Sequence, residues 1–251
     1  MELDYFEIEK KIIRFIQNTV KTANSRGVVI GISGGIDSSV VATLCTKALG
    51  KENILGIVLP CESKPEDVEH GILLAETIGI PYKVINLDET YSALVNAVNP
   101  AIEKNDNPMA YGNIKSRLRM TTLYFESALK CYLVVGTTNK SEWITGYFTK
   151  YGDGGADFEP IGDLLKREVV ALGHHLGLPE LLVNRVPDAG LISAQTDEDE
   201  FGFTYDALDT YIATGKGSPD IIEKINRLYK INNHKREMPS MLNLERYFFL
   251  K

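Results

Sequence analysis

The chain has 251 residues and a net charge of −7, and 44% of its residues are hydrophobic and 24% charged. This composition is typical of a globular protein with a real core, and it excludes wholesale disorder and fibrous repeats. No apolar run reaches the about 18 residues of a membrane span, no secretory signal opens the sequence, and the acidic balance argues against a nucleic-acid surface. We therefore expect one cytoplasmic domain over residues 1–251, without a membrane or nucleic-acid partner.

Hydrophobic periodicity predicts short buried strands that alternate with helices along the first half of the chain. We expect strands at 27–32, 54–59, 82–87 and 131–135, and helices at 4–25, 36–49, 65–78, 90–98 and 113–130. Apolar strands separated by helices indicate an α/β fold, a doubly wound parallel sheet with helices on both faces. The glycine-rich stretch 145–162 is predicted to be a functional loop, followed by helices at 164–176, 180–183, 205–213 and 219–232.

The most informative motif lies between the first predicted strand and the next helix, and it reads Gly31, Ile32, Ser33, Gly34, Gly35, Ile36, Asp37, Ser38. A glycine turn that opens a helix presents free N–H groups and a positive dipole end to an anion, and phosphate suits such a site. A carboxylate there would repel phosphate unless a divalent cation lies between them, so Asp37 predicts Mg²⁺. The simpler alternative is a tight turn capped by serine hydroxyls.

This motif resembles the Ser-Gly-Gly-x-Asp-Ser loop of the ATP pyrophosphatases, whose fold is described as adenine nucleotide alpha-hydrolase-like. Four further segments resemble the NAD synthetase family in that family's order, namely 112–120, 136–142, 146–157 and 233–236. The resemblance implies a homodimer that amidates deamido-NAD with ammonia. It also implies that ATP is consumed through an adenylated intermediate, with NAD, AMP and pyrophosphate as the products and Mg²⁺ as the cofactor.

The resemblance also implies a role for individual residues. The whole loop from Gly31 to Ser38 would bind ATP together with Thr137 and Lys166, and Asp37 and Glu142 would hold Mg²⁺. Lys166 and the metal on Asp37 would offset charge in the transition state, and no covalent enzyme intermediate is needed. Asp188 stands where the family usually has a hydroxyl near ATP, which puts that contact in doubt. Contacts to deamido-NAD are implied for Arg117, Lys150, Asp157, His234 and Lys235.

The predicted helix 113–130 carries two apolar stripes, which favours two packing partners. Ile114, Leu118, Phe125 and Leu129 form the first stripe, and Met120 and Tyr124 form the second. The sheet is one partner, and a second copy of the chain is a plausible other. Periodicity alone does not choose Arg117 over its neighbours Lys115 and Arg119 as the ligand-binding cation.

Rival functions stay open on the sequence alone. Another adenylating pyrophosphatase, one that amidates a purine nucleotide or modifies tRNA, would share residues 33–38 but need not share 150–157. A nonenzymatic nucleotide sensor would not need two metal ligands, and a scaffold would need neither. The three scattered cysteines predict reduced structural thiols, and we expect Cys61 to be a small buried hydrophobic residue rather than a glutaminase nucleophile. Residues 195–198, Gly202 and Tyr205 are expected to be structural.

Overall fold

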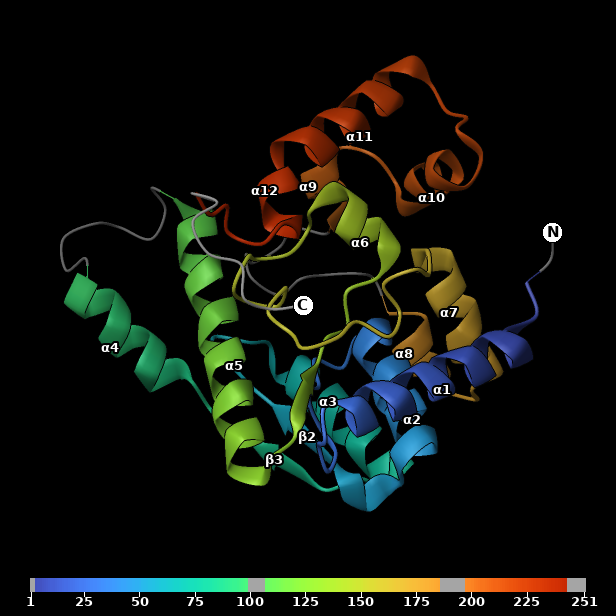
Figure 1. The fold of residues 1–251 in the computed structure, drawn as a ribbon. Helices are drawn as coiled ribbons and strands as arrows, with labels where there is room; N and C mark the ends of the chain where they lie inside the picture. Colours follow the sequence, from blue (N-terminus) through green and yellow to red (C-terminus); the bar gives the residue numbers. More distant parts are fainter. Residues whose placement is uncertain (1–2, 99–106, 186–196, 243–251) are drawn as a thin grey trace.

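Four parallel strands form the centre of the molecule in a computed structural model that describes residues 3–98, 107–185 and 197–242 (Figure 1). The strands lie in the order β3-β2-β1-β4, so the chain starts at the middle of the sheet and winds toward both edges. The strands are short and mostly apolar; β1, β2 and β4 are largely buried, as parallel strands usually are, whereas the edge strand β3 is partly exposed. The bounds are Val28–Gly31 for β1, Ile54–Val58 for β2, Tyr82–Val84 for β3 and Leu133–Val135 for β4.

Helices cover both faces of this sheet, which confirms the doubly wound α/β prediction. Alternate residues of β1 point to opposite sides, so Val28 and Ile30 enter one core while Val29 enters the other. The first core is closed by α1 (Tyr5–Thr22), α2 (Ile36–Leu49), α3 (Pro65–Ile78), α7 (Lys166–His175) and α8 (Glu180–Val183). The second is closed by α4 (Asp88–Val98) and α5 (Pro108–Lys130).

The remaining helices gather above the sheet in Figure 1, at the end where the strands terminate. They are α6 (Lys140–Thr145), α9 (Asp197–Phe201), α10 (Tyr205–Thr214), α11 (Pro219–Ile231) and α12 (Asn233–Arg236), and a 3-10 turn, η1 (Lys51–Asn53), precedes β2. Phe201, Leu208 and Ile225 form a small separate core between these helices. None of the helices in the described part of the chain is both long and apolar enough to cross a membrane.

Several boundaries differ from the sequence-based expectations. Cys131 is exposed and ends α5 in the left-handed conformation with φ of +58°, so β4 begins at Leu133 rather than at residue 131. The start of α5 moves to Pro108, because the Asn107 side chain accepts a hydrogen bond from the N–H of Ala110 at 3.1 Å. Neither α6 nor α9 was expected as a separate helix.

The first apolar stripe expected on α5 divides along the helix. Ile114 and Leu118 pack against the core formed by α4 and the sheet, whereas Phe125 is 64% exposed and Leu129 is 66% exposed. The core contacts of α4 come from Tyr91 and Val95, which lie in the same cluster as the N-terminal half of α5. The C-terminal half of the stripe is therefore left as an exposed apolar face.

Candidate active site

The loop after β1 turns sharply toward α2. Gly34 has φ of +75°, a left-handed conformation that favours glycine, and a Cβ there would lie 2.6 Å from the Cβ of His70 on α3. Gly35 precedes α2, and no side chain of the described residues caps the start of that helix. The first N–H groups of α2 are therefore left for a ligand. Together with the helix dipole they favour an anion, as the motif predicts.

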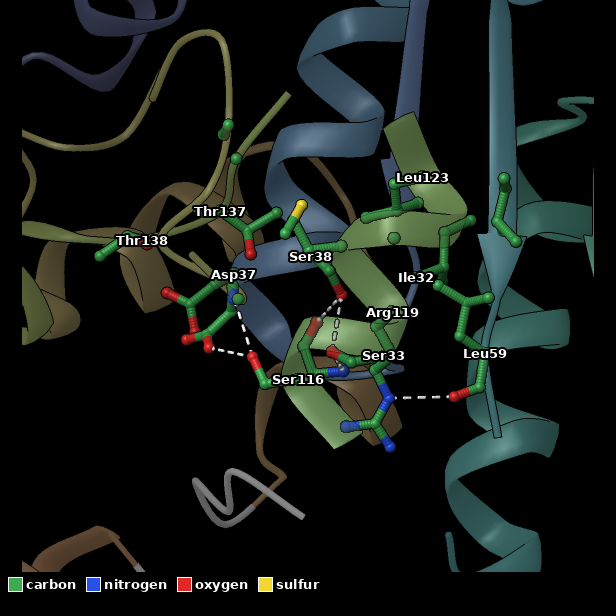
Figure 2. A pocket seen from close by; sticks show the side chains of 18 of the residues that line it. Ile32, Ser33, Asp37, Ser38, Leu59, Ser116, Arg119, Leu123, Thr137 and Thr138 are labelled. Atoms are coloured by element: carbon green, nitrogen blue, oxygen red, sulfur yellow. Dashed lines mark hydrogen bonds between the residues drawn. The ribbon is translucent and has the colours of Figure 1, made fainter. Parts of the chain in front are cut away.

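Serine hydroxyls hold this loop in shape and line the cavity beside it (Figure 2). The hydroxyls of Ser33 and Ser38 lie 3.1 Å apart, and Ser38 donates a hydrogen bond of 3.0 Å to the carbonyl of Gly35. The N–H of Gly35 in turn donates to Ser33 Oγ at 3.3 Å. The serine-capped turn and the anion site are thus the same structure, because these bonds leave the helix N–H groups free.

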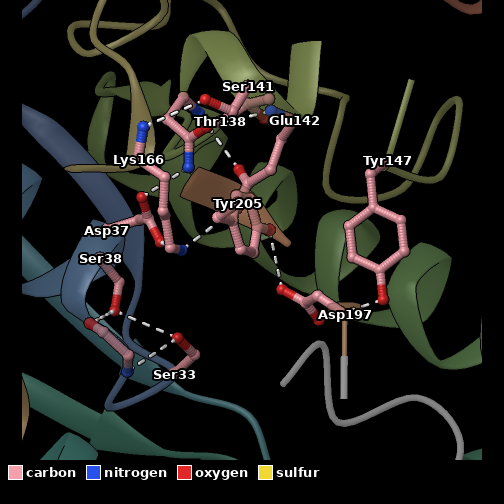
Figure 3. Close-up of polar contacts among 12 residues, drawn as sticks. Ser33, Asp37, Ser38, Thr138, Ser141, Glu142, Tyr147, Lys166, Asp197 and Tyr205 are labelled. Carbon is pink, nitrogen blue, oxygen red and sulfur yellow. Dashed lines mark hydrogen bonds and ion pairs between the residues drawn. The ribbon is translucent and has the colours of Figure 1, made fainter. Parts of the chain in front are cut away.

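A buried lysine and two carboxylates lie next to the loop, as Figure 3 shows. Lys166 Nζ at the start of α7 is 2.5 Å from Asp37 Oδ2 and 3.4 Å from Glu142 Oε1. Asn139 joins the group, since its Nδ2 donates to Asp37 Oδ1 at 2.9 Å and its side-chain oxygen accepts from the N–H of Glu142 at 3.0 Å. Three elements, α2, α6 and α7, therefore bring their charged side chains to one point.

The electrostatics of this group follow from its burial. Burial, followed by the charge of Asp37, raises the pKa of Glu142 to about 8, although Lys166 acts in the opposite direction. Burial alone would lower the pKa of Lys166, but Asp37 and Glu142 outweigh it and the pKa is raised. Lys166 is thus a permanent cation, while one positive charge is shared between two carboxylates. The cluster has an excess of negative charge when Glu142 is ionised.

Asp197 of α9, Tyr205 of α10 and Tyr147 of the loop after α6 form a hydrogen-bonded group beside this cluster. The Tyr205 ring centroid lies 5.3 Å from Lys166 Nζ, and the Tyr205 hydroxyl donates to Asp197 Oδ2 at 2.9 Å. Tyr147 donates to the other oxygen of Asp197 at 3.1 Å (Figure 3). Burial and the surrounding carboxylates raise the pKa of Tyr205, so its hydroxyl stays protonated. Tyr205 was expected to be structural, and it lies against the catalytic candidate Lys166.

The cavity at this site has a volume of about 300 Å³ and lies where β1, β2 and β4 end. One part is polar and contains the loop and the Asp37, Glu142 and Lys166 cluster. The other part is apolar and is lined by side chains of β2, β4 and α5, such as Ile57, Val135 and Leu123, and Arg119 of α5 also lines the cavity. The Nε of Arg119 donates to the carbonyl of Leu59 at 3.0 Å, and one terminal nitrogen donates to Ser63 Oγ at 3.2 Å. A flat ring beside a phosphate chain fits this division.

The structure brings together most of the residues predicted to bind ATP and metal. Thr137 and Lys166 line the cavity. The predicted loop contributes seven further residues to the described lining: Gly31, Ile32, Ser33, Gly35, Ile36, Asp37 and Ser38. Gly34 is outside that lining and packs against α3 instead. Asp188 lies outside the described residues. Glu142 also lines the cavity, so both predicted metal ligands share it.

The residues predicted to bind deamido-NAD lie outside the described lining of this cavity. Arg117 is exposed and donates to the Lys150 carbonyl at 3.3 Å, and Lys150 in turn bonds to the His234 carbonyl. Lys235 donates to the carbonyls of Gly146 and Phe148, at 2.7 and 2.8 Å. These contacts bring Arg117, Lys150, His234 and Lys235 together in one group beside the long loop.

Asp157 has a different environment, and its role in binding deamido-NAD stays a prediction. Its carboxylate accepts hydrogen bonds from the N–H of Val134 at 2.7 Å and from the Tyr124 hydroxyl at 3.1 Å. Of the three cations considered on α5, Lys115 is buried and paired with Glu62 at 3.0 Å, whereas Arg119 lines the cavity. The three cations therefore face three different surroundings.

Sequence reasoning missed several residues of the site. Arg119 was named only as an alternative, and Asn139, Arg185 and Asp197 were not proposed. Arg119, Arg185 and Asp197 line the cavity, and Asn139 hydrogen-bonds to Asp37. Arg185 forms an ion pair with Asp67, and both residues line the cavity near the loop. The one available signal was for Asn139, because Asn three residues before Glu is a helix-capping pattern. The others are brought to the cavity by tertiary packing.

The donor set of the cluster fits Mg²⁺. Mg²⁺ prefers carboxylate oxygens and is usually held by one or two of them together with substrate phosphates. Asp37 and Glu142 supply two such carboxylates next to an anion-binding helix start, and their mutual repulsion is only partly offset by Lys166. Among the described residues, no third Asp, Glu, His or Cys side chain joins these two carboxylates as a metal ligand. The remaining positions would thus fall to phosphate oxygens and water.

Comparisons with known proteins agree with this arrangement. The chain is 44% identical over 241 residues to the NH(3)-dependent NAD(+) synthetase of Carboxydothermus hydrogenoformans, covering 96% of this chain and 99% of that protein. It is 43% identical to the protein of the same name from Finegoldia magna, covering 97% and 99%.

Solved structures show the same likeness. An NMN synthetase from Francisella tularensis superposes with a TM-score of 0.91 at 33% identity, covering 97% of this chain and 100% of that one. An NH3-dependent NAD synthetase from Campylobacter jejuni gives a TM-score of 0.80 at 36% identity, covering 96% and 100%. The family model described as NAD synthase matches residues 8–239, and the chain belongs to the NAD synthase family.

Proposed function

We propose that this protein amidates the nicotinate carboxylate of deamido-NAD with ammonia, consuming ATP and releasing NAD, AMP and pyrophosphate. The observation that carries the proposal is the cluster of Lys166, Asp37 and Glu142 beside the uncapped start of α2, within one cavity. An anion site that also contains two carboxylates suits a nucleoside triphosphate bound with a divalent cation. Membership of the NAD synthase family supports the choice of acceptor.

The chemistry requires activation because a carboxylate is a poor electrophile for ammonia. In the first step a carboxylate oxygen attacks the α-phosphorus of ATP, a P–O bond forms, and the bond to the bridging oxygen breaks as pyrophosphate leaves with its electron pair. Ammonia then adds to the activated carbonyl carbon, AMP leaves with the C–O bonding pair, and the nitrogen loses a proton. The products are an amide, AMP and pyrophosphate.

Protein groups act mainly by alignment and charge neutralisation. The N–H groups at the start of α2 and the Ser33 and Ser38 hydroxyls would hold the pyrophosphate portion. Lys166 would offset the charge that develops on the leaving group. Mg²⁺, when bound by Asp37 and Glu142, supplies further neutralisation of the phosphates. Thr137 would contact ATP, and Asp188 is a weaker candidate for the same role.

A direct assay tests the proposal. Purified protein is incubated with ATP, MgCl₂, ammonium chloride and deamido-NAD, and NAD, AMP and pyrophosphate are quantified over time. Equal molar yields of the three products are expected, and omission of any one component should abolish NAD formation. AMP without NAD, or NAD without AMP, would contradict the proposed reaction.

A second substrate deserves comparison because the Francisella tularensis protein with a TM-score of 0.91 is titled an NMN synthetase. Nicotinate mononucleotide carries the same carboxylate as deamido-NAD but lacks the adenylate half. The same assay with this mononucleotide gives the ratio of the two kcat/KM values. A higher kcat/KM for deamido-NAD supports the first choice, and a higher value for the mononucleotide assigns the second function.

We further propose a homodimer in which α5 contributes to the interface, and a cytoplasmic location. Phe125 and Leu129 form an exposed apolar face on α5, and Arg117 lies exposed on the same helix. Charge in an apolar interface is costly, so Phe125→Glu should favour the monomer. Sedimentation equilibrium should give twice the 27.9 kDa chain mass for the native protein. A native monomer, or a dimer unaffected by Phe125→Glu, would contradict this interface.

A further inference from the structure

Asp209 on α10 is a fully buried acid that lies outside the described lining of the cavity. Its Oδ1 accepts a hydrogen bond from the Ser141 hydroxyl at 2.5 Å, and its Oδ2 accepts one from the N–H of Arg167 at 2.9 Å. The exposed fraction of Asp209 is 0%, so water does not compete for these bonds. A charged or polar group is retained at such depth only when its partners are fixed.

The partners of Asp209 belong to α6 and α7, two of the three helices that carry the charged cluster. Ser141 directly precedes Glu142 on α6, and Arg167 directly follows Lys166 on α7. Ser141 also accepts a hydrogen bond from the N–H of Lys166 at 3.1 Å. The N-cap residue of α7, Leu165, has no side-chain oxygen that could accept hydrogen bonds from the first turn. Ser141 of α6 and Asp209 of α10 accept them instead, from the first two N–H groups of α7.

This arrangement fixes the position of Lys166 relative to Glu142. The two helices are separated along the chain by the irregular stretch 146–165, which forms turns and a parallel β-bridge from Phe158 to Val135 of β4. Two hydrogen bonds donated by backbone N–H groups join the start of α6 to the start of α7. One is the bond from Lys166 N to the Ser141 hydroxyl, and the other runs from Lys140 N to Leu164 O at 2.8 Å. Asp209 adds hydrogen bonds to both helices at this junction, and each of its partners is next in sequence to Glu142 or Lys166.

We infer that Asp209 is a positioning residue that aligns Lys166 and Glu142, and thereby the divalent cation and the pyrophosphate leaving group, although it touches neither. The inference rests on the proposed function for its kinetic consequence. A displacement of about 1 Å in such a group can cost roughly a hundredfold in rate. Loss of the Asp209 carboxylate should therefore reduce kcat much more than it changes KM for deamido-NAD.

Three variants test this role. Asp209→Ala removes both acceptors, and Ser141→Ala removes only the bridge between the helices. Asp209→Asn is the conservative variant, because an amide can still accept from Arg167 and donate to Ser141. The matched control is Glu126→Gln, which alters another buried carboxylate, paired with Lys83 at 2.8 Å, between α5 and β3. Ser141→Ala keeps the test available if Asp209→Ala does not fold.

Kinetics supply the first readout. We expect kcat to fall about 30- to 100-fold in Asp209→Ala and about tenfold in Ser141→Ala, with KM for deamido-NAD changed less than about threefold. Asp209→Asn should recover at least about half of the loss on a logarithmic scale. A kcat for Asp209→Ala within about threefold of the Glu126→Gln control would overturn the inference, since that control reports a purely structural loss.

Two further readouts do not depend on turnover. Hydrogen exchange in a peptide covering the Lys166 and Arg167 amides should be faster in Asp209→Ala and unchanged in Glu126→Gln. Calorimetric titration with MgCl₂ should show affinity weakened about tenfold in Asp209→Ala, because Glu142 loses its fixed position. If the native protein makes no NAD, the proposed function fails while these two readouts still decide the positioning role. Unchanged exchange and unchanged Mg²⁺ affinity would overturn it.

Discussion

Replacing Lys166 with methionine removes a cation that lies within 3.4 Å of both Asp37 and Glu142. The lysine side chain is 8% exposed, and those of the carboxylates are 17% and 15% exposed, so water screens the group little. Breaking a buried ion pair by deleting one partner typically costs about 3 to 5 kcal/mol. Because Glu142 can take up a proton, we expect the lower end, about 3 kcal/mol of unfolding free energy at pH 7.

The pH dependence of this loss distinguishes the mechanism. Burial and Asp37 raise the pKa of Glu142 to about 8 in the native fold, and losing Lys166 should raise it further. Because the pKa of Glu142 is higher in the folded than in the unfolded state, the free energy of unfolding falls as pH rises from the unfolded pKa to the folded one. In Lys166→Met this fall continues past pH 8. The difference in unfolding free energy between the native protein and Lys166→Met should be constant below about pH 8 and then grow by about 1.4 kcal/mol per pH unit.

Urea denaturation at several pH values measures these differences, and turnover is followed in parallel. We expect kcat to fall about 10²- to 10³-fold, as for loss of a preorganised charge at a reacting centre. Lys140→Met is the control, because Lys140 pairs with an Asp163 that is 95% exposed and should contribute less than about 1 kcal/mol. A Lys166→Met stability within about 1 kcal/mol of the native protein at both pH 7 and pH 9 would refute this electrostatic reasoning.

The other predictions concern the loop, the metal and a second buried acid. Gly34→Ala should destabilise the fold more than Gly79→Ala, since both have positive φ but only the Gly34 position meets backbone within about 3 Å, and equal losses in urea denaturation would refute the packing argument. Mg²⁺ binding should weaken about tenfold per pH unit below about pH 8 and release protons, because Glu142 must ionise, and calorimetry in two buffers checks this. Burial raises the pKa of Glu159 to about 8 in the fold, so the native protein should lose stability relative to Glu159→Gln as pH rises from 5 to 8, and parallel curves would contradict it.

Sequence patterns predicted those parts of the fold that depend on local chemistry. The loop between β1 and α2 follows from two glycines and a set of serines within eight residues, and the parallel sheet follows from apolar strands separated by helices. Asp37 and Glu142 were also expected at one sheet edge, because the ends of β1 and β4 share it.

Other features depend on tertiary packing, which periodicity does not specify. Arg117 and Arg119 are two positions apart and point to different sides of α5, and only the docking of that helix onto the sheet decides that Arg119 lines the cavity. Asp209 lies more than 40 residues beyond Lys166 in the sequence and contacts the neighbouring residue Arg167 only through tertiary packing, so no local motif links the two. The left-handed turn at Cys131 likewise reflects how α5 ends rather than the apolar run that follows.

The most direct test of the proposed reaction follows the carboxylate oxygen. Deamido-NAD labelled with ¹⁸O in its carboxylate is turned over with unlabelled ATP and ammonium, and the AMP and pyrophosphate are analysed by mass spectrometry. Attack of the carboxylate on the α-phosphorus predicts one ¹⁸O atom in each AMP and none in pyrophosphate. Label in pyrophosphate, or AMP that carries no label, would contradict the account of how this cavity orients ATP.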